Sequence, residues 1–152
     1  MDASSGTLFG SYSTTPDQAT ALGGLAAPTA WSPLAAGSSP ATPALARSGN
    51  TVYMAVQGNG NNNIYWNSSV DGGVTWGPVW QQLPSGMTSS KPPSLAVVNG
   101  TLYLSYLGDG NNQINITSLQ NASSNIWASQ YVIPGQSATY ASLVAESAGS
   151  SQ

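Results

Sequence analysis

The sequence predicts an all-β fold made of three tandem repeat units of about fifty residues each. Residues 49–62 and 99–112 align at an offset of fifty, with a threonine, a tyrosine, two glycines and two asparagines in common. The alignment continues without a gap to Pro84 and Pro134. Short apolar and aromatic segments alternate with turns rich in glycine and asparagine, and no segment has helical periodicity.

The N-terminal part of the chain is a third, more divergent copy of the same unit. Residues 6–12 parallel 100–106, and residues 43–46 parallel 93–96. The segment 141–144 repeats the second element once more. We therefore expect a single domain over residues 1–152, with units at about 6–48, 49–98 and 99–146 and a polar tail at 147–152.

Each complete unit is predicted to hold four antiparallel strands, which is the composition of a β-propeller blade. Asn99-Gly100 is a strong hairpin signal, because both residue types tolerate positive φ. We expect strand A at 94–98, at the end of the second unit, followed in the third unit by strand B at 101–107, strand C at 113–118 and strand D near 129–133.

Strand C has two unlike faces. Ile64 and Trp66 of the second unit match Ile114 and Ile116 of the third, and we expect this face to be buried between blades. The opposite face carries Tyr65 and Asn67 in the second unit and Asn115 and Thr117 in the third.

The order of the strands predicts how a ring would close. The chain supplies strands B-C-D, then two complete A-B-C-D sets, then a lone strand A at 140–146. Unpaired strand edges invite pairing, and three blades are fewer than the roughly four to eight of known propellers. We therefore expect a homodimeric six-bladed ring in which each C-terminal strand completes the partner's first blade. A fragment of a longer propeller and an open fibre are the alternatives.

The composition excludes several classes of function. Arg47 and Lys91 are the only basic residues, so the chain cannot form a basic groove for nucleic acid. There is no apolar run of eighteen residues, and we expect no membrane insertion. Without cysteine or histidine there is no disulfide framework, thiol catalysis or Cys-ligated zinc, and the commonest general base is missing. No cofactor or metal is expected.

The surface of the protein is expected to be polar but uncharged, which suggests a secreted or extracellular protein. No signal peptide is recognisable after Met1, so a leader has been replaced or export is not encoded here. Four N-glycosylation sequons support the extracellular assignment, at Asn67, Asn99, Asn115 and Asn121.

Residues 69–76 contain the pattern Ser-x-Asp-x-Gly-x-Thr-Trp. A tight turn between strands C and D needs glycine at positive φ, and a short acid can accept hydrogen bonds from the turn amides. Trp31 and Trp127 are taken as the counterparts of Trp76 in the other units. We expect structural roles for the residues that define the pattern, namely Ser69, Asp71, Gly73, Thr75 and Trp76.

This pattern resembles the Asp-box of the sialidase superfamily. The flanking segments 63–66 and 93–103 are similar to those of sialidase-like propellers and of bacterial and fungal propeller lectins. The resemblance covers roughly residues 44–146, and it implies a propeller fold. It also implies that sialidase activity would require an arginine triad, which a chain with Arg47 as its single arginine cannot build.

Other glycosidases need two carboxylates about 5–10 Å apart. With Asp71 assigned to its turn, Asp109 and Glu146 are the only pair in well-patterned sequence, and a solvent-exposed Glu146 is the simpler interpretation. The Asn-rich loops at 58–63 and 108–112 offer too few carboxylates for calcium and are expected to be simple turns. We therefore expect no enzyme activity.

The favoured function is that of a carbohydrate-binding lectin for neutral glycans, bound by aromatic faces and amide groups. Aromatic residues that do not recur between units are the best ligand candidates, because recurring ones belong to the blade core. Trp80 matches Gln130, and Tyr65 matches Asn115. A structural extracellular coat or filament subunit built by strand exchange is the alternative, and a glycosidase-like enzyme is a distant third. The candidate ligand residues are Trp80, Tyr65, Asn61, Asn111 and Asp109.

Overall fold

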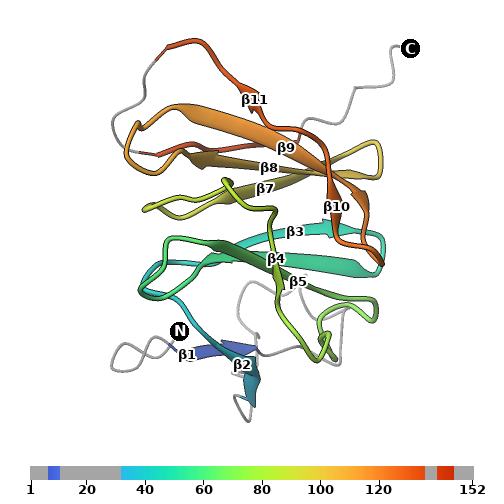
Figure 1. Ribbon diagram of the computed structural model, residues 1–152. Coiled ribbons are helices and arrows are strands. Elements are labelled where there is room, and N and C mark those ends of the chain that lie inside the picture. The colour runs from blue at the N-terminus through green and yellow to red at the C-terminus, as the bar shows by residue number, and fades with distance from the viewer. Residues whose placement is uncertain (1–6, 11–31, 136–139, 146–152) are drawn as a thin grey trace, which may run out of the picture.

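The computed structural model describes residues 7–10, 32–135 and 140–145 of the chain. These residues form three antiparallel sheets that lie one above another, and they contain no helix (Figure 1). The predicted all-β fold is therefore confirmed. The described residues form an open stack and no closed ring.

The middle sheet has the predicted strand order A-B-C-D within the second unit. It consists of β3 (Ala44–Ser48), β4 (Thr51–Gln57), β5 (Ile64–Ser69) and the short β6 (Gln81–Gln82), each paired antiparallel with the next. The neighbours along the chain are therefore also neighbours in the sheet, which is the simplest way to satisfy the backbone of short strands.

The third sheet repeats this arrangement with two differences. It consists of β7 (Ser94–Val98), β8 (Thr101–Leu107), β9 (Ile114–Asn121), β10 (Ile126–Trp127) and β11 (Tyr131–Val132). Strand C, expected to end at Ser118, continues to Asn121, where a turn leads into the unpredicted β10. Strand D is β11, which pairs with β9 within the predicted range.

The predicted Asn-Gly hairpin is present between β7 and β8. Asn99 and Gly100 have φ values of 49° and 78°, and Val98 pairs with Thr101 directly across the turn. Both central positions are therefore left-handed, as a two-residue hairpin with the native strand twist requires.

The first sheet differs from the predicted blade. β1 (Thr7–Gly10) lies within the predicted strand B, but it pairs directly with β2 (Ser32–Ser38), which the sequence did not indicate as a strand. β2 is rich in small residues and has no β-branched ones, so pairing rather than propensity defines it. The predicted strand C of this unit and Trp31 lie outside the described residues.

The C-terminal segment also differs from its prediction. Residues 140–145, expected to be part of a strand A, pair with no strand in the part of the chain that the structure describes. In the complete units strand A is paired with the strand B that follows it, as β7 is with β8. A strand cannot form without such a partner for its backbone groups.

The main core lies between the middle and third sheets. The predicted burial of the Ile64 and Trp66 face of strand C is confirmed, since these side chains are 0% and 2% exposed. The buried residues of this core are Ala55, Ile64, Trp66, Leu83, Met87, Leu95, Leu102, Leu104, Tyr106 and Trp127.

In the third sheet the matching face of strand C is not covered by another sheet of the described chain. Ile114 and Ile116 are partly exposed, whereas Asn115 and Thr117, on the opposite face of β9, are 4% and 3% exposed. The physical reason is the stacking: each sheet has a different neighbour on each side, and β9 turns its Asn115 face towards the middle sheet. The isoleucine face points away from the stack.

Trp76 and Trp127 are not structural counterparts. Trp127 is buried in the main core, whereas Trp76 packs on the other side of the middle sheet against Met54 and Val56. The pairing of these two tryptophans in the repeat was therefore wrong, because the turn after β9 is replaced by the β9–β10 hairpin.

Asn125, which is partly exposed, connects the second and third units at the edge of this core. Its side-chain oxygen accepts hydrogen bonds from the indole N–H groups of Trp66 at 2.8 Å and Trp127 at 3.1 Å. Its amide nitrogen donates to the carbonyl of Gln82 at 2.7 Å. The two indoles meet edge to face with ring centroids 5.7 Å apart. One side chain thus satisfies two tryptophans in the same core.

Asn125 has a φ of 51°, so its role can be tested without straining the backbone. We expect Asn125→Gly to lower the free energy of unfolding by about 2–4 kcal/mol, because two buried donors lose their acceptor. Asn99→Gly, at a left-handed but exposed position, should change it little. Urea unfolding followed by tryptophan fluorescence measures both, and equal effects would contradict the role of Asn125.

Candidate functional site

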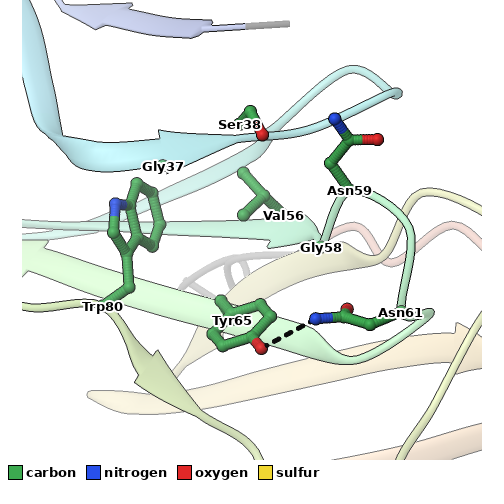
Figure 2. Close-up of a pocket in the computed structure, with 8 residues that line it drawn as sticks. All are labelled: Gly37, Ser38, Val56, Gly58, Asn59, Asn61, Tyr65 and Trp80. Atoms are coloured by element: carbon green, nitrogen blue, oxygen red, sulfur yellow. Dashed lines mark hydrogen bonds between the residues drawn. The ribbon is translucent and has the colours of Figure 1, made fainter.

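A cavity of about 190 Å³ lies between β2 and the middle sheet (Figure 2). Three of the predicted ligand residues, which are up to nineteen positions apart in the chain, come together in its wall: Trp80, Tyr65 and Asn61. Among the residues that the structure describes, no charged side chain lines the cavity. Its lining residues are Gly37, Ser38, Val56, Gly58, Asn59, Asn61, Tyr65 and Trp80.

The two aromatic rings form the apolar part of the wall. Tyr65 lies in β5, and Trp80 immediately precedes β6, so neighbouring strands of one sheet carry both. Both rings are partly buried in a small core cluster with Met54 and Val56. The indole of Trp80 rises towards Gly37, while the ring of Tyr65 points to Asn61 (Figure 2). The rings are therefore held by packing and still reach the cavity.

The loop between β4 and β5 supplies the polar part of the wall. The side-chain oxygen of Asn61 accepts a hydrogen bond from the Asn63 backbone at 3.1 Å, which closes a tight turn. The Asn61 amide nitrogen donates to the Tyr65 hydroxyl at 3.1 Å (Figure 2). Because the hydroxyl accepts in this bond, its own proton can be donated to a ligand.

Two glycines make room for the aromatic rings. A Cβ atom at Gly37 would lie 2.7 Å from Nε1 of Trp80, and one at Gly58 would lie 2.6 Å from Cε2 of Tyr65. Either contact would force the ring to move. The observed ring positions therefore depend on glycine at both places.

Two buried serines in matching positions show that the junction between the first and second units resembles the junction between the second and third units. Ser39 donates to the carbonyl of Ala41 at 2.9 Å, and Ser89 donates to that of Lys91 at 3.0 Å. Both serines are fully buried. The offset of fifty residues therefore holds in space as well as in sequence, and residue 37 corresponds to residue 87.

The corresponding place between the second and third units is filled. Met87 stands where the first junction has Gly37, and Tyr106 stands where it has Val56, and both larger residues are buried. The Tyr106 hydroxyl donates a hydrogen bond to the side chain of Gln130, and burial raises the pKa of this tyrosine to about 12, so it stays protonated. The cavity thus arises from smaller residues at two positions of the repeat.

The other two predicted ligand residues do not line the cavity. Asn111 accepts a hydrogen bond from the Gln113 backbone at 2.9 Å and holds the same turn in the third unit that Asn61 holds in the second. Asp109 accepts a hydrogen bond from the side chain of Asn62 at 3.1 Å, so it links the loops of two adjacent units. Both residues have local structural partners.

Asp71 is held inside the turn between β5 and β6. The hydroxyl and backbone N–H of Thr75 donate to its carboxylate at 2.6 and 2.8 Å, and the Ser69 hydroxyl donates at 2.7 Å. These hydrogen bonds, those of Thr75 foremost, lower the pKa of Asp71 to about 2. The carboxylate is therefore ionised and fully engaged in its turn.

The same turn supports the cavity wall. Gly73 has a φ of 99°, donates its N–H to Ser69 at 2.8 Å and offers its carbonyl to the indole N–H of Trp76 at 3.1 Å. Trp76 packs in the same cluster as Tyr65 and Trp80. The predicted turn motif thus positions a tryptophan behind the two aromatic residues of the cavity.

Asp71 predicts a specific acid sensitivity. Its pKa in the folded protein, about 2, is below its ordinary value of 3.8, so its contribution to stability is present above about pH 4 and lost as the pH falls towards 2. We expect Asp71→Asn to unfold at lower urea concentration than the parent at pH 5 and to show a smaller further loss down to pH 2. Asp109→Asn is the charge-matched control. An unchanged acid dependence in Asp71→Asn would contradict the assignment.

Within the described ranges, no group of three or more acidic, histidine or cysteine residues could hold a metal ion. The same part of the chain has no helix long and apolar enough to cross a bilayer. Glu146 lies outside the described residues, so the structure does not place the Asp109–Glu146 pair.

Comparison of the chain with protein-family models, curated proteins and solved structures gives no match.

Proposed function

We propose that the cavity between the first and middle sheets binds neutral carbohydrate. The observation that carries this proposal is the convergence of Trp80, Tyr65 and Asn61 on one cavity. Sugar rings present apolar C–H faces that stack on aromatic rings, together with hydroxyls that pair with amides and phenols. A mostly apolar wall with a few placed polar groups is typical of small-molecule sites.

The size and charge of the cavity limit the kinds of ligand that it can bind. A volume of about 190 Å³ is below the roughly 300–1,000 Å³ of drug-sized sites and suits one small ring. Arg47 donates to the carbonyl of Gly49 at an exposed turn, and neither it nor Lys91 lines the cavity. An acidic sugar would lose water without gaining a cation, which favours neutral glycans.

Binding is tested on a glycan array and by calorimetry on the sugars that bind. We expect Trp80→Ala to weaken binding by about tenfold or more, because it removes the larger aromatic face. Val56→Tyr, which copies the third unit, should fill the cavity and also abolish binding. Both variants should keep the parent's far-ultraviolet circular dichroism.

Two matched variants serve as controls for this experiment. Tyr131→Ala removes an aromatic ring that is 65% exposed and remote from the lining, and Asn111→Ala removes the turn asparagine of the third unit. Both should bind as the parent does. The proposal fails if the parent binds no glycan, or if binding survives both Trp80→Ala and Val56→Tyr.

An extracellular location belongs to the same proposal, and the exposure of the sequons supports it in part. Asn99 and Asn121 are exposed and could carry glycans in the folded protein. Asn67 and Asn115 are each 4% exposed, so a glycan there would not fit the fold. We therefore expect carbohydrate at Asn99 and Asn121 and none at Asn67 and Asn115.

We further propose that the three units are blades of a propeller whose six-bladed ring contains two chains. The stacked antiparallel sheets and the continuous core between the second and third units support blades. The partly exposed isoleucine face of β9 supports a further sheet beyond the third. This open face also favours the second candidate function, a structural subunit that assembles through the same face.

Light scattering coupled to size exclusion separates these assemblies. We expect a single species at twice the 15.4 kDa mass of the chain, because closure by a two-fold axis consumes all open faces. Larger, concentration-dependent species or filaments by electron microscopy would favour the structural subunit. A monodisperse monomer would contradict both assemblies.

A further inference from the structure

The middle and third sheets are stacked through their first strands. β7 of the third sheet packs on β3 of the middle sheet, so strand A of one unit lies against strand A of the next (Figure 1). The main core then extends outwards from this contact to strands B and C. The position of strand A therefore determines where the rest of a sheet will lie.

Residues 140–145 occupy the corresponding place on the third sheet. The backbone N–H of Leu143 donates to the Ser94 hydroxyl of β7 at 2.9 Å, and Ala141 is buried. The segment also resembles β7 in sequence, with Ser142-Leu143 matching Ser94-Leu95. The chain thus holds a segment that aligns with strand A against its own third sheet.

This segment differs from β7 in one respect, its missing strand partner. β7 pairs with β8 from Ser94–Ser105 to Val98–Thr101, whereas 140–145 pairs with no strand among the described residues. Val144 is 89% exposed. A segment that packs against a sheet and has no strand paired with it can accept a strand from another chain.

The face beside this segment is also incompletely covered. Ile64 and Trp66 of β5 are buried because the third sheet covers them. Their counterparts Ile114 and Ile116 of β9 are partly exposed. This face of strand C is therefore covered by the next sheet in the middle sheet, and it is left partly open in the third sheet.

We propose that β1 of a second copy of the chain pairs with residues 140–145, and that its first sheet covers the isoleucine face of β9. β1 aligns with strand B of the complete units, and in the described part of the chain it pairs on one side only, with β2. This inference rests on the two-chain ring proposed above. It adds that residues 140–145 remain packed against the third sheet of their own chain, and that β1 of the second copy pairs with them there.

The repeat also determines the register of this contact. Ala96 pairs with Tyr103 in the third unit, and these positions correspond to Val144 and Phe9. Val144 therefore lies opposite the partner's Phe9. Likewise Val97 pairs with Leu102, which places Ala145 opposite the partner's Leu8.

The register is tested by disulfide cross-linking, which the chain allows because it contains no cysteine. Isotope-labelled and unlabelled Phe9→Cys/Val144→Cys chains are unfolded, mixed, refolded and oxidised, and linked peptides are identified by mass spectrometry. We expect about half of the 9–144 peptides to join one labelled and one unlabelled chain. Thr7→Cys/Val144→Cys, displaced by two residues, is the matched control and should cross-link at least tenfold less.

A second pair, Leu8→Cys/Ala145→Cys, guards against a variant that fails to fold. Cross-links confined to single chains would show that the segment pairs with its own β1 and would overturn the proposal. A dimer by light scattering without either cross-link would overturn this contact and leave the two-chain ring standing. A monomer by light scattering would overturn both this contact and the two-chain ring. Glycan binding by the parent is read independently of all three results.

Discussion

The structure depends on the burial of Trp66 between two sheets. A chain with so few charges must hold its sheets together by apolar packing, and this indole is the largest contribution of the middle sheet to the shared core. Its N–H would be costly to bury alone. Asn125 removes that cost for Trp66 and for Trp127 together, and its own amide bonds back to the middle sheet. The hydrogen bonds of the Asn125 side chain thus help to align the second and third units.

The same repeat produces a filled junction and an open one. Between the second and third units, Met87 and Tyr106 complete the packing. Between the first and second units, Gly37 and Val56 leave the space in which Trp80 stands. The cavity arises where the repeat departs from its own pattern, because the recurring residues are already engaged in holding the sheets together.

The sequence predicted three of the residues that line the candidate site and missed the others. Trp80 and Tyr65 were found because they do not recur, and Asn61 because it lies in a polar loop. Asn111 and Asp109 followed from the same reasoning, yet they hold a turn and an inter-unit link instead. Gly37, Ser38, Val56, Gly58 and Asn59 were missed. Comparing small with large residues at the offset of fifty would have revealed Gly37 against Met87 and Val56 against Tyr106.

By itself the sequence determined the repeat, the hairpins and most strands, because these depend on local pattern: the left-handed Asn99-Gly100 turn and the period of each strand act within a few residues. Only the tertiary structure decided which face of each sheet is buried. Ile64 and Ile114 hold the same place in the repeat, yet one is enclosed and the other partly exposed, because burial depends on what covers a sheet. The cavity likewise forms only where the first and middle sheets meet, because residues of both sheets line it.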